Sequence, residues 1–315
     1  MKNSKYLIGI DIGGTDTKIG IIDSKGSIIA KTKTETLTKS SVQLLVRRIH
    51  SVCHELAEDA SIKWEDLLYI GIGMPGILDL INGSIVFSPN IREWSGVPIV
   101  SIFQKEMDKI CVLENDANAA AWGEKWAGAG KDSKLGSLIM ITLGTGIGGG
   151  IILEDKIWHG CKNGAGEFGH IVIETNGREC GCGNYGCAEA YASATAVVKR
   201  YKEASDLTDD ITAEDIFREA LNGNNIARKV MEETGMYIAI LIVNIMHTLN
   251  PDVIVIGGGM AAAEDLLAKP ISDEVNKRIA RFGTNSTKIV FGRLENDAGM
   301  IGAAGWARKT LEISV

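Results

Sequence analysis

Cys180, Cys182 and Cys187 lie within eight residues of one another, and His170 precedes the first of them by ten residues. Three thiolates and one imidazole are the ligands of a closed tetrahedral zinc site, which has no open position for catalysis. The spacing C-x-C-x₄-C differs from the C-x₂-C of a generic zinc finger. Redox-active thiols and small buried side chains therefore stay open as alternatives. Disulfides are not expected, because nothing in the sequence suggests export.

Two glycine-threonine turns, Gly14-Thr15 and Gly144-Thr145, occur 130 residues apart. The exposed amides and hydroxyl of such a turn can bond phosphate oxygens. A single copy would be interpreted as a plain hairpin turn, but two copies favour phosphate binding. Asp11 ends the strand before the first turn, where a carboxylate could hold Mg²⁺. The G-x-G-x-x-G at 144–149 is not a dinucleotide fingerprint, because a strand follows it where the fingerprint requires a helix.

Asp116 stands at a predicted strand-to-helix junction, in the sequence Asn-Asp-Ala-Asn. One interpretation is that its carboxylate simply caps the N-terminus of the helix. It could also act as a general base, since phosphoryl transfer to an alcohol requires a carboxylate near the hydroxyl, metal-neutralised phosphates and in-line geometry. The residue types alone leave both interpretations open.

The elements that must position these residues follow from hydrophobic periodicity. The first half predicts an antiparallel meander of three strands and then two further strands and two helices: strands 6–10, 17–22, 27–36, 68–74 and 110–114, and helices 41–60 and 117–127, with 79–94 as a loop-rich segment. The second half predicts strands 138–143, from 150, 253–256 and 288–294, and helices 188–204, 212–221, 226–249, 264–279 and 298–309. The repeated strand-turn-strand unit indicates duplicated α/β domains that face a shared cleft.

The length and composition limit the classes of protein to which this chain can belong. A chain of 315 residues suggests two domains. A formal net charge of −7 argues against a protein that works by gripping nucleic acid. The beginning of the sequence does not resemble a signal peptide, and the most apolar segment, 237–246, is too short to cross a membrane. We therefore expect a cytoplasmic protein with neither a nucleic acid nor a membrane as partner.

Taken in order, the motifs resemble the ROK family (repressors, open reading frames, sugar kinases), within the actin-like ATPase and hexokinase fold. The match covers nearly the whole chain: Asp11 to Thr15 with Lys18, Gly73 to Gly76, Pro89-Asn90 with Trp94, Glu114 to Ala120, Leu143 to Gly150, Gly166 to His170, Cys180 to Cys187 with Glu189, and Leu249 to Gly259. The resemblance implies an α/β protein of two actin-like ATPase (hexokinase-type) domains facing a central cleft, with a zinc knuckle. The implied domains are 1–117 plus 299–315, and 118–298.

The resemblance also implies ATP-dependent phosphorylation of the 6-hydroxyl of a hexose, with Asp116 as the catalytic base. The sugar would be held by Gly76, Asn90, Asn115, Asp116, Glu167, His170 and Glu189. ATP and Mg²⁺ would be held by Asp11, Gly13, Gly14, Thr15, Lys18, Gly144, Thr145, Gly146, Gly257, Gly258 and Gly259. A structural Zn²⁺ would be held by His170, Cys180, Cys182 and Cys187, and it would fix the His170 ring, whose other nitrogen contacts the sugar.

The sequences from Glu167 to His170 and from Glu189 to Thr195 look most like the glucokinase branch, so glucose is the expected substrate. An N-acetylmannosamine or N-acetylglucosamine kinase is the alternative. A sugar-responsive repressor is disfavoured, since the ten residues before Asp11 predict a strand and leave no recognition helix. A non-catalytic sugar sensor is disfavoured by Asp116, because binding alone needs no base. The family also implies a homodimer or a homotetramer.

Overall fold

The computed structural model describes residues 6–88, 91–131, 135–279 and 286–312. The chain divides into two compact units: Met1–Lys134 with Gly150–Ala165 and Asn296–Val315, and Leu135–Gly149 with Gly166–Glu295. The predicted domain boundaries at 117/118 and 298/299 stay a prediction. The first compact unit also contains 118–134 and 150–165, because the helix from Asp116 packs against the C-terminal helix of that unit.

A five-stranded sheet organises the first unit. Its strands are β1 (Tyr6–Ile12), β2 (Asp16–Ile22), β3 (Ile28–Glu35), β4 (Leu67–Met74) and β7 (Ile110–Asn115), in the order β3-β2-β1-β4-β7. The first three strands pair antiparallel, which confirms the predicted meander, and β4 and β7 continue the sheet in parallel. The register places Asp11 beside Gly73 and Gly73 beside Glu114. The ends of β1, β4 and β7 therefore meet at one edge of this sheet.

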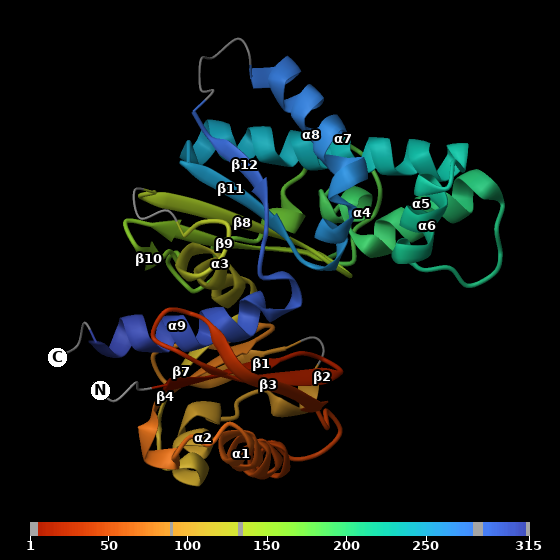
Figure 1. Cartoon of the computed structure of the whole chain (residues 1–315). Helices are drawn as coiled ribbons and strands as arrows, with labels where there is room; N and C mark the ends of the chain where they lie inside the picture. The colour runs from red at the N-terminus through yellow and green to blue at the C-terminus, as the bar shows by residue number, and fades with distance from the viewer. Residues whose placement is uncertain (1–5, 89–90, 132–134, 280–285, 313–315) are drawn as a thin grey trace. The chain divides into compact units, whose positions relative to one another are not determined.

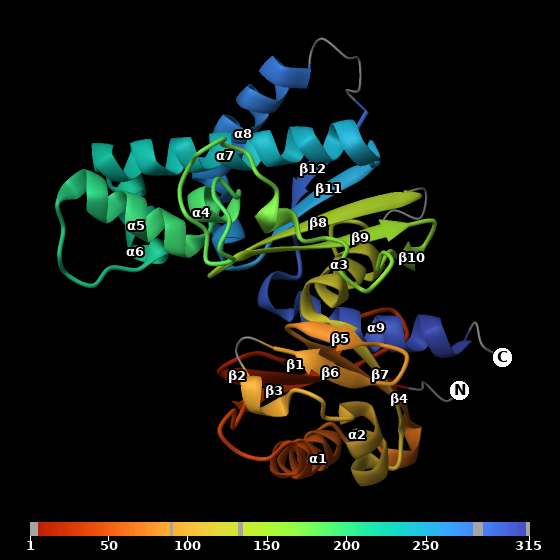
Figure 2. The same cartoon turned by 180° about the vertical axis from the view of Figure 1, so that it is seen from behind.

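Helices cover both faces of the first sheet. Figures 1 and 2 show α1 (Val42–Asp59) and α2 (Ile99–Met107) on one face and α9 (Ala298–Glu312) on the other. The sheet glycines let α9 approach closely, because a Cβ atom at Gly71 would lie 1.8 Å from the Ala303 carbonyl oxygen. Helix α3 (Asp116–Trp126) crosses α9 as closely, since a Cβ atom at Gly302 would lie 1.6 Å from the Ala119 carbonyl oxygen.

The segment predicted as loop-rich contains more regular structure than expected. It holds most of a small antiparallel pair, β5 (Ile77–Asp79) and β6 (Ser84–Phe87), and the short helix η2 (Arg92–Trp94). A second short helix, η1 (Trp64–Asp66), precedes β4. The hairpin was missed because its strands are only three and four residues long, below the length at which alternation becomes readable.

The second sheet has the same plan as the first. Its strands are β8 (Ser137–Leu143), β9 (Ile147–Leu153), β10 (Lys156–Ile157), β11 (Val253–Gly257) and β12 (Lys288–Phe291), in the order β10-β9-β8-β11-β12. Strands β8, β9 and β10 take the places of β1, β2 and β3, and β11 and β12 continue in parallel as β4 and β7 do. The internal repeat is thus confirmed at the level of topology. The turns 13–15 and 144–146 occupy equivalent positions in the two sheets.

The helices of the second unit are α4 (Glu189–Ala192), α5 (Ala194–Ser205), α6 (Ala213–Leu221), α7 (Asn225–Leu249) and α8 (Glu264–Ile279), with the short helices η3 (Phe168–His170), η4 (Gly259–Ala263) and η5 (Glu295–Asp297). The Thr212 capping box is confirmed. The predicted single helix 188–204 is wrong: Ser193 is extended and caps a new helix at Ala194.

Helix α7 is the longest element of the second unit, and it ends at Asn250 in the left-handed conformation, directly before Pro251. Among the described residues it is the one helix long and apolar enough to cross a membrane, but 61% of its most apolar window is buried inside the protein. This burial is typical of a helix in a protein core.

Candidate active site and metal centre

Asp116 is the first residue of α3, and the capping of that helix falls to its neighbour. The Asn115 side-chain oxygen accepts hydrogen bonds from the backbone N–H groups of Ala117 at 3.0 Å and Asn118 at 3.3 Å. Asn115 is therefore the N-cap, and the interpretation of Asp116 as merely the N-cap is wrong. The Asp116 carboxylate is half-buried and also accepts from the Ala117 N–H at 2.9 Å. This position leaves the carboxylate at the end of β7, at the start of α3.

Gly76 lies next to Asn115, as expected for two residues assigned to one sugar. The Asn115 amide donates to the Gly76 carbonyl at 3.4 Å. Gly76 has a φ of +117°, and a Cβ atom there would lie 2.4 Å from the Phe87 carbonyl oxygen, so only glycine fits this bend. Asn90, which the sequence also assigned to the sugar, lies outside the described residues.

Asp11 lies at the end of β1 in the same unit. Its cross-strand partner is Lys18, whose ammonium nitrogen is 3.8 Å from the Asp11 carboxylate. The pKa of Asp11 is raised to about 6. Burial is the largest cause of this rise, the nearby Lys18 opposes it, and the charge of Asp116 adds to it. A carboxylate held among apolar groups and near a second carboxylate is stabilised in its charged form by a cation. Asp11 is thus suited to hold Mg²⁺.

The turn after Asp11 is tight and its tip faces solvent. The Gly13 N–H donates to the Asp16 carbonyl at 3.0 Å, and the Thr15 carbonyl accepts from the Thr36 N–H at 2.9 Å. Gly14 and Thr15 are exposed. Their amides and the threonine hydroxyl are the groups that the sequence assigned to phosphate.

The equivalent turn of the second unit is anchored to α5. The Gly144 N–H donates to the Gly146 carbonyl at 2.9 Å, the Gly144 carbonyl accepts from Ala194, and the Thr145 carbonyl accepts from the Thr195 hydroxyl. Strand β11 lies beside β8 in parallel, so Gly257, Gly258 and Gly259 come to the same sheet edge as this turn.

Gly258 shows why glycine is needed beside that turn. It has a φ of +83°, and a Cβ atom there would lie 2.5 Å from the Leu143 carbonyl oxygen. The backbone at Gly258, directly after β11, can therefore approach the end of β8 only because glycine has no side chain. The two glycine-rich segments that the sequence assigned to the nucleotide are brought together within this unit.

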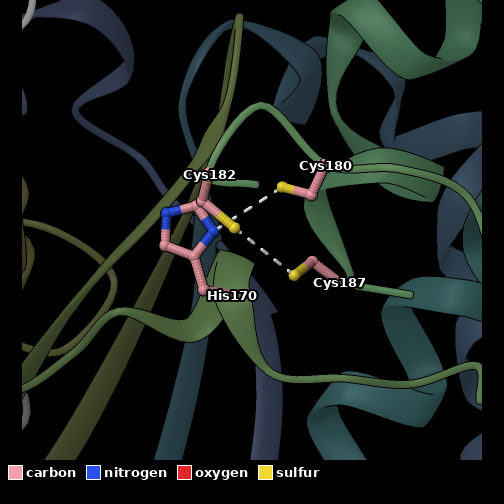
Figure 3. A group of neighbouring side chains, drawn as sticks. All are labelled: His170, Cys180, Cys182 and Cys187. Atoms are coloured by element: carbon pink, nitrogen blue, oxygen red, sulfur yellow. Dashed lines mark hydrogen bonds between the residues drawn. The ribbon is translucent and has the colours of Figure 1, made fainter. Parts of the chain in front are cut away.

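His170, Cys180, Cys182 and Cys187 converge on one point in the second unit, as Figure 3 shows. Their ligand atoms all lie within 4.8 Å of one another. The Cys182 and Cys187 sulfur atoms are 3.8 Å apart, and the Cys180 sulfur is 3.8 Å from His170 Nδ1. A tetrahedral zinc ion with bonds of about 2.3 Å to sulfur places two sulfur atoms about 3.8 Å apart. The donor set and its spacing therefore fit Zn²⁺.

The thiols are not paired as disulfides, since each of the six cysteines is free and a disulfide needs sulfur atoms about 2.05 Å apart. Two small bridges hold the knuckle in shape, Val172 with Cys187 and Glu179 with Tyr185. At Gly186, with a φ of +79°, a Cβ atom would lie 1.8 Å from the Glu174 carbonyl oxygen. Tight local backbone packing thus brings the cysteines close to one another.

Glu189 connects the knuckle to the glycine turn. One carboxylate oxygen accepts from the Ile147 N–H at 2.9 Å, and the other is 3.8 Å from the Cys180 sulfur. Gly146 has no room for a side chain, because a Cβ atom there would lie 2.4 Å from the Glu189 carboxylate. Glu167 is exposed and precedes η3, which carries His170. Of the residues assigned to the sugar, His170 thus belongs to the cysteine cluster and Glu189 lies beside it.

One interacting pair close to Asp116, formed by Glu114 and His159, was not predicted from the sequence. Glu114 is 1% exposed and one of its oxygens lies 2.8 Å from His159 Nε2. The other accepts from the backbone N–H of Asn115 at 2.9 Å and from the Asn118 amide at 3.0 Å. The pair ties the segment around His159 to the residues on both sides of Asp116. No local pattern indicates it, because 45 residues separate the partners.

We expect Glu114→Gln and His159→Gln each to lower the free energy of unfolding by about 1–3 kcal/mol, because each leaves a buried polar group poorly paired. The double variant should lose less than the sum, by a coupling of about 0.5–3 kcal/mol. Urea denaturation of the four proteins measures this. Glu58→Gln on the exposed face of α1 is the matched control, with an expected change within about 0.5 kcal/mol. Additive losses would show that the two side chains do not interact.

Comparison with known proteins agrees with this architecture. The sequence matches the ROK family model over residues 7–310. It is 35% identical over 310 residues to a glucokinase of Thermotoga maritima, and the alignment covers 95% of this chain and 96% of that protein. The similarity therefore extends through both compact units.

Solved structures give the same result. A ROK hexokinase from Thermus thermophilus superposes with a TM-score of 0.83 at 28% identity, covering 98% of this chain and 99% of that one. A ROK family glucokinase from Streptomyces griseus, solved in complex with glucose and AMPPNP, superposes with a TM-score of 0.81 at 30% identity, covering 96% and 99%. The chain belongs to the ROK family and has the α/β fold of its hexokinase-type members.

Proposed function

We propose that this chain transfers the γ-phosphoryl group of ATP to the 6-hydroxyl of glucose. The observation that carries the proposal is the placement of Asp116 at the first residue of α3, where Asn115 caps the helix. The similarity to glucokinases over nearly the whole chain, and to one that binds glucose and AMPPNP, supports the same substrates.

In the proposed reaction Asp116 accepts the proton of the 6-hydroxyl as that oxygen attacks the γ-phosphorus and the bond to the β-phosphate oxygen breaks, giving the sugar phosphate and ADP. Gly76, Asn90, Asn115, Glu167, His170 and Glu189 hold the other sugar groups. A polar set of this kind rejects a wrong stereoisomer, because its own buried groups would be left unpaired.

Asp11 and Lys18 hold the phosphate end of the nucleotide, together with the turns 13–15 and 144–146, and Gly257, Gly258 and Gly259 accommodate the adenosine. Mg²⁺ at Asp11 would neutralise charge on the phosphate oxygens when bound. The proposal requires residues of both units to act on one ATP and one sugar. The predicted central cleft is part of the proposal.

His170, Cys180, Cys182 and Cys187 would hold a structural Zn²⁺. With Nδ1 turned toward the sulfur atoms, His170 has Nε2 left to contact a sugar hydroxyl. A metal that fixes a substrate-contacting ring acts as an organiser of the site rather than as a Lewis acid.

The test is ADP release with ATP and Mg²⁺ over glucose, mannose, fructose, allose, N-acetylglucosamine and N-acetylmannosamine. We expect the highest kcat/KM with glucose. A preference for an N-acetylated sugar would retain the phosphoryl transfer and overturn the glucose assignment. No turnover with any sugar would overturn the proposed activity. We also propose that the enzyme is a homodimer or a homotetramer, which light scattering of the purified protein measures.

A further inference from the structure

Two histidines that the proposed activity does not use lie side by side on α1. His50 and His54 are four residues apart and so project from the same face of the helix. Their Nε2 atoms are 3.0 Å apart, and their rings meet edge to face with centroids 4.7 Å apart. Both side chains are partly exposed. The pair therefore places two potential ligand nitrogen atoms side by side near the surface.

Neighbouring side chains fix both rings. The His54 ring stacks on Trp64, with centroids 3.9 Å apart and planes 17° apart. His50 Nδ1 is 3.7 Å from a Glu106 carboxylate oxygen. This separation is longer than a hydrogen bond, but the negative charge on that side favours the proton on Nδ1 and leaves Nε2 as a ligand, as the carboxylates behind metal-binding histidines do.

The spacing of the two nitrogen atoms matches a right angle at a metal ion. Two nitrogen ligands at about 2.05 Å are about 2.9 Å apart when cis at 90° and about 3.4 Å apart in a tetrahedron. The observed 3.0 Å is close to the first value. Imidazole in square-planar or tetragonal geometry is typical of Ni²⁺ and Cu²⁺ sites.

Charged groups of both signs lie near the pair. Glu58 and Lys109 both interact electrostatically with His54. Arg47 faces Glu106 at 3.9 Å, and Lys109 donates to the Trp64 carbonyl at 2.8 Å. A cation that approaches the pair therefore meets carboxylates as well as basic groups.

The pair lies at the opposite end of the first unit from the proposed base. Trp64 begins η1, which directly precedes β4, and Lys109 directly precedes β7. Asp116 directly follows β7, and Asp11, near the end of β1, pairs with Gly73 near the end of β4. Within this unit, a ligand at the histidines is therefore separated from Asp116 and Asp11 by the length of the strands.

We propose that His50 and His54 form a second metal site, which binds one divalent transition-metal ion of the Ni²⁺ or Cu²⁺ type through both Nε2 atoms, with water in the remaining positions. The alternative occupant of the space between the two nitrogens is a single shared proton. An ion bound there would join two turns of α1 and stabilise the helix against unfolding.

Ni²⁺ titration of the full chain, with zinc retained at the cysteine cluster, tests the site. Because Trp64 stacks on His54, bound Ni²⁺ should quench its fluorescence with saturation at one ion per chain and should raise the Tm. His50→Gln and His54→Gln should each weaken the affinity about tenfold or more, by analogy with the loss of supporting groups at metal sites. Trp64→Phe should lose the saturable quenching and retain the rise in Tm. His247→Gln, in the second unit, is the matched control and should bind as the unaltered chain does.

Two results would overturn the proposal. One is the absence of a saturable Ni²⁺ effect on fluorescence or Tm, which would leave only a shared proton between the rings. The other is an unchanged Ni²⁺ affinity in both His50→Gln and His54→Gln, which would place the ion elsewhere. Both variants change partly exposed positions of α1, and circular dichroism before metal addition verifies that each is folded.

Discussion

Asp116→Asn should lower kcat for glucose about 100- to 10,000-fold, the usual contribution of a positioned general base. Asparagine has nearly the same size and keeps an oxygen that can accept from the Ala117 N–H, as Asp116 does at 2.9 Å. The N-cap of α3 is Asn115, which the change does not touch. The variant should therefore fold normally and bind glucose with nearly the original Kd.

The measurement is kcat from steady-state ADP release and the glucose Kd from calorimetry, for both proteins. A secondary consequence follows from charge. Since the Asp116 carboxylate raises the pKa of Asp11, which burial holds at about 6, the substitution should lower that pKa. Asn118→Asp would be a poor control, because Asn118 donates to the buried Glu114. Glu58→Gln, on the exposed face of α1, is the better one. A wild-type kcat in Asp116→Asn would remove this residue from the role of base.

Cys187→Ser should abolish binding of the proposed structural zinc and reduce kcat/KM for glucose at least about tenfold, the usual loss when the groups that orient a site are removed. Cys187 is fully buried and its sulfur lies 3.8 Å from that of Cys182. The binding free energy of a structural zinc ion is about 10–16 kcal/mol, so its loss should also unfold the knuckle. His170 belongs to the same cluster and Glu189 lies 3.8 Å from the Cys180 sulfur, so both would lose their fixed positions.

Elemental analysis of zinc per chain, with thermal unfolding, measures this effect. We expect one zinc ion in the unaltered protein, much less in Cys187→Ser, and a lower Tm in the variant. Cys161→Ser is the matched control, because Cys161 is exposed and lies outside the cluster; it should keep both zinc and activity. Protein that is fully active without zinc would contradict the organising role of the metal.

The sequence alone was sufficient to predict the elements whose signals are local. The paired Gly-Thr turns predicted the duplicated plan, because the same strand-turn-strand pattern must fold the same way in both halves, and the two sheets share one strand order. The capping box at Thr212 and the end of α7 at Asn250-Pro251 were also predictable, because each depends on neighbouring residues only.

Three features could not be predicted from the sequence. In two of them the local residue preferences favoured neighbouring positions equally, and in the third the contact joins residues far apart in the chain. Either Asn115 or Asp116 could cap α3, and the backbone decides for Asn115. Helical composition continues through Ser193, where an extended residue divides α4 from α5. The His159 and Glu114 side chains meet across 45 residues, a separation at which no spacing rule applies.

The most direct test of the proposed activity is the product of one reaction. The protein, ATP, Mg²⁺ and glucose should yield glucose 6-phosphate and ADP in equal amounts, whereas 6-deoxyglucose, which lacks the accepting hydroxyl, should yield no sugar phosphate. Phosphate on another hydroxyl of glucose, or ADP formed without any sugar phosphate, would contradict the assignment of this chain as a kinase of the glucose 6-hydroxyl.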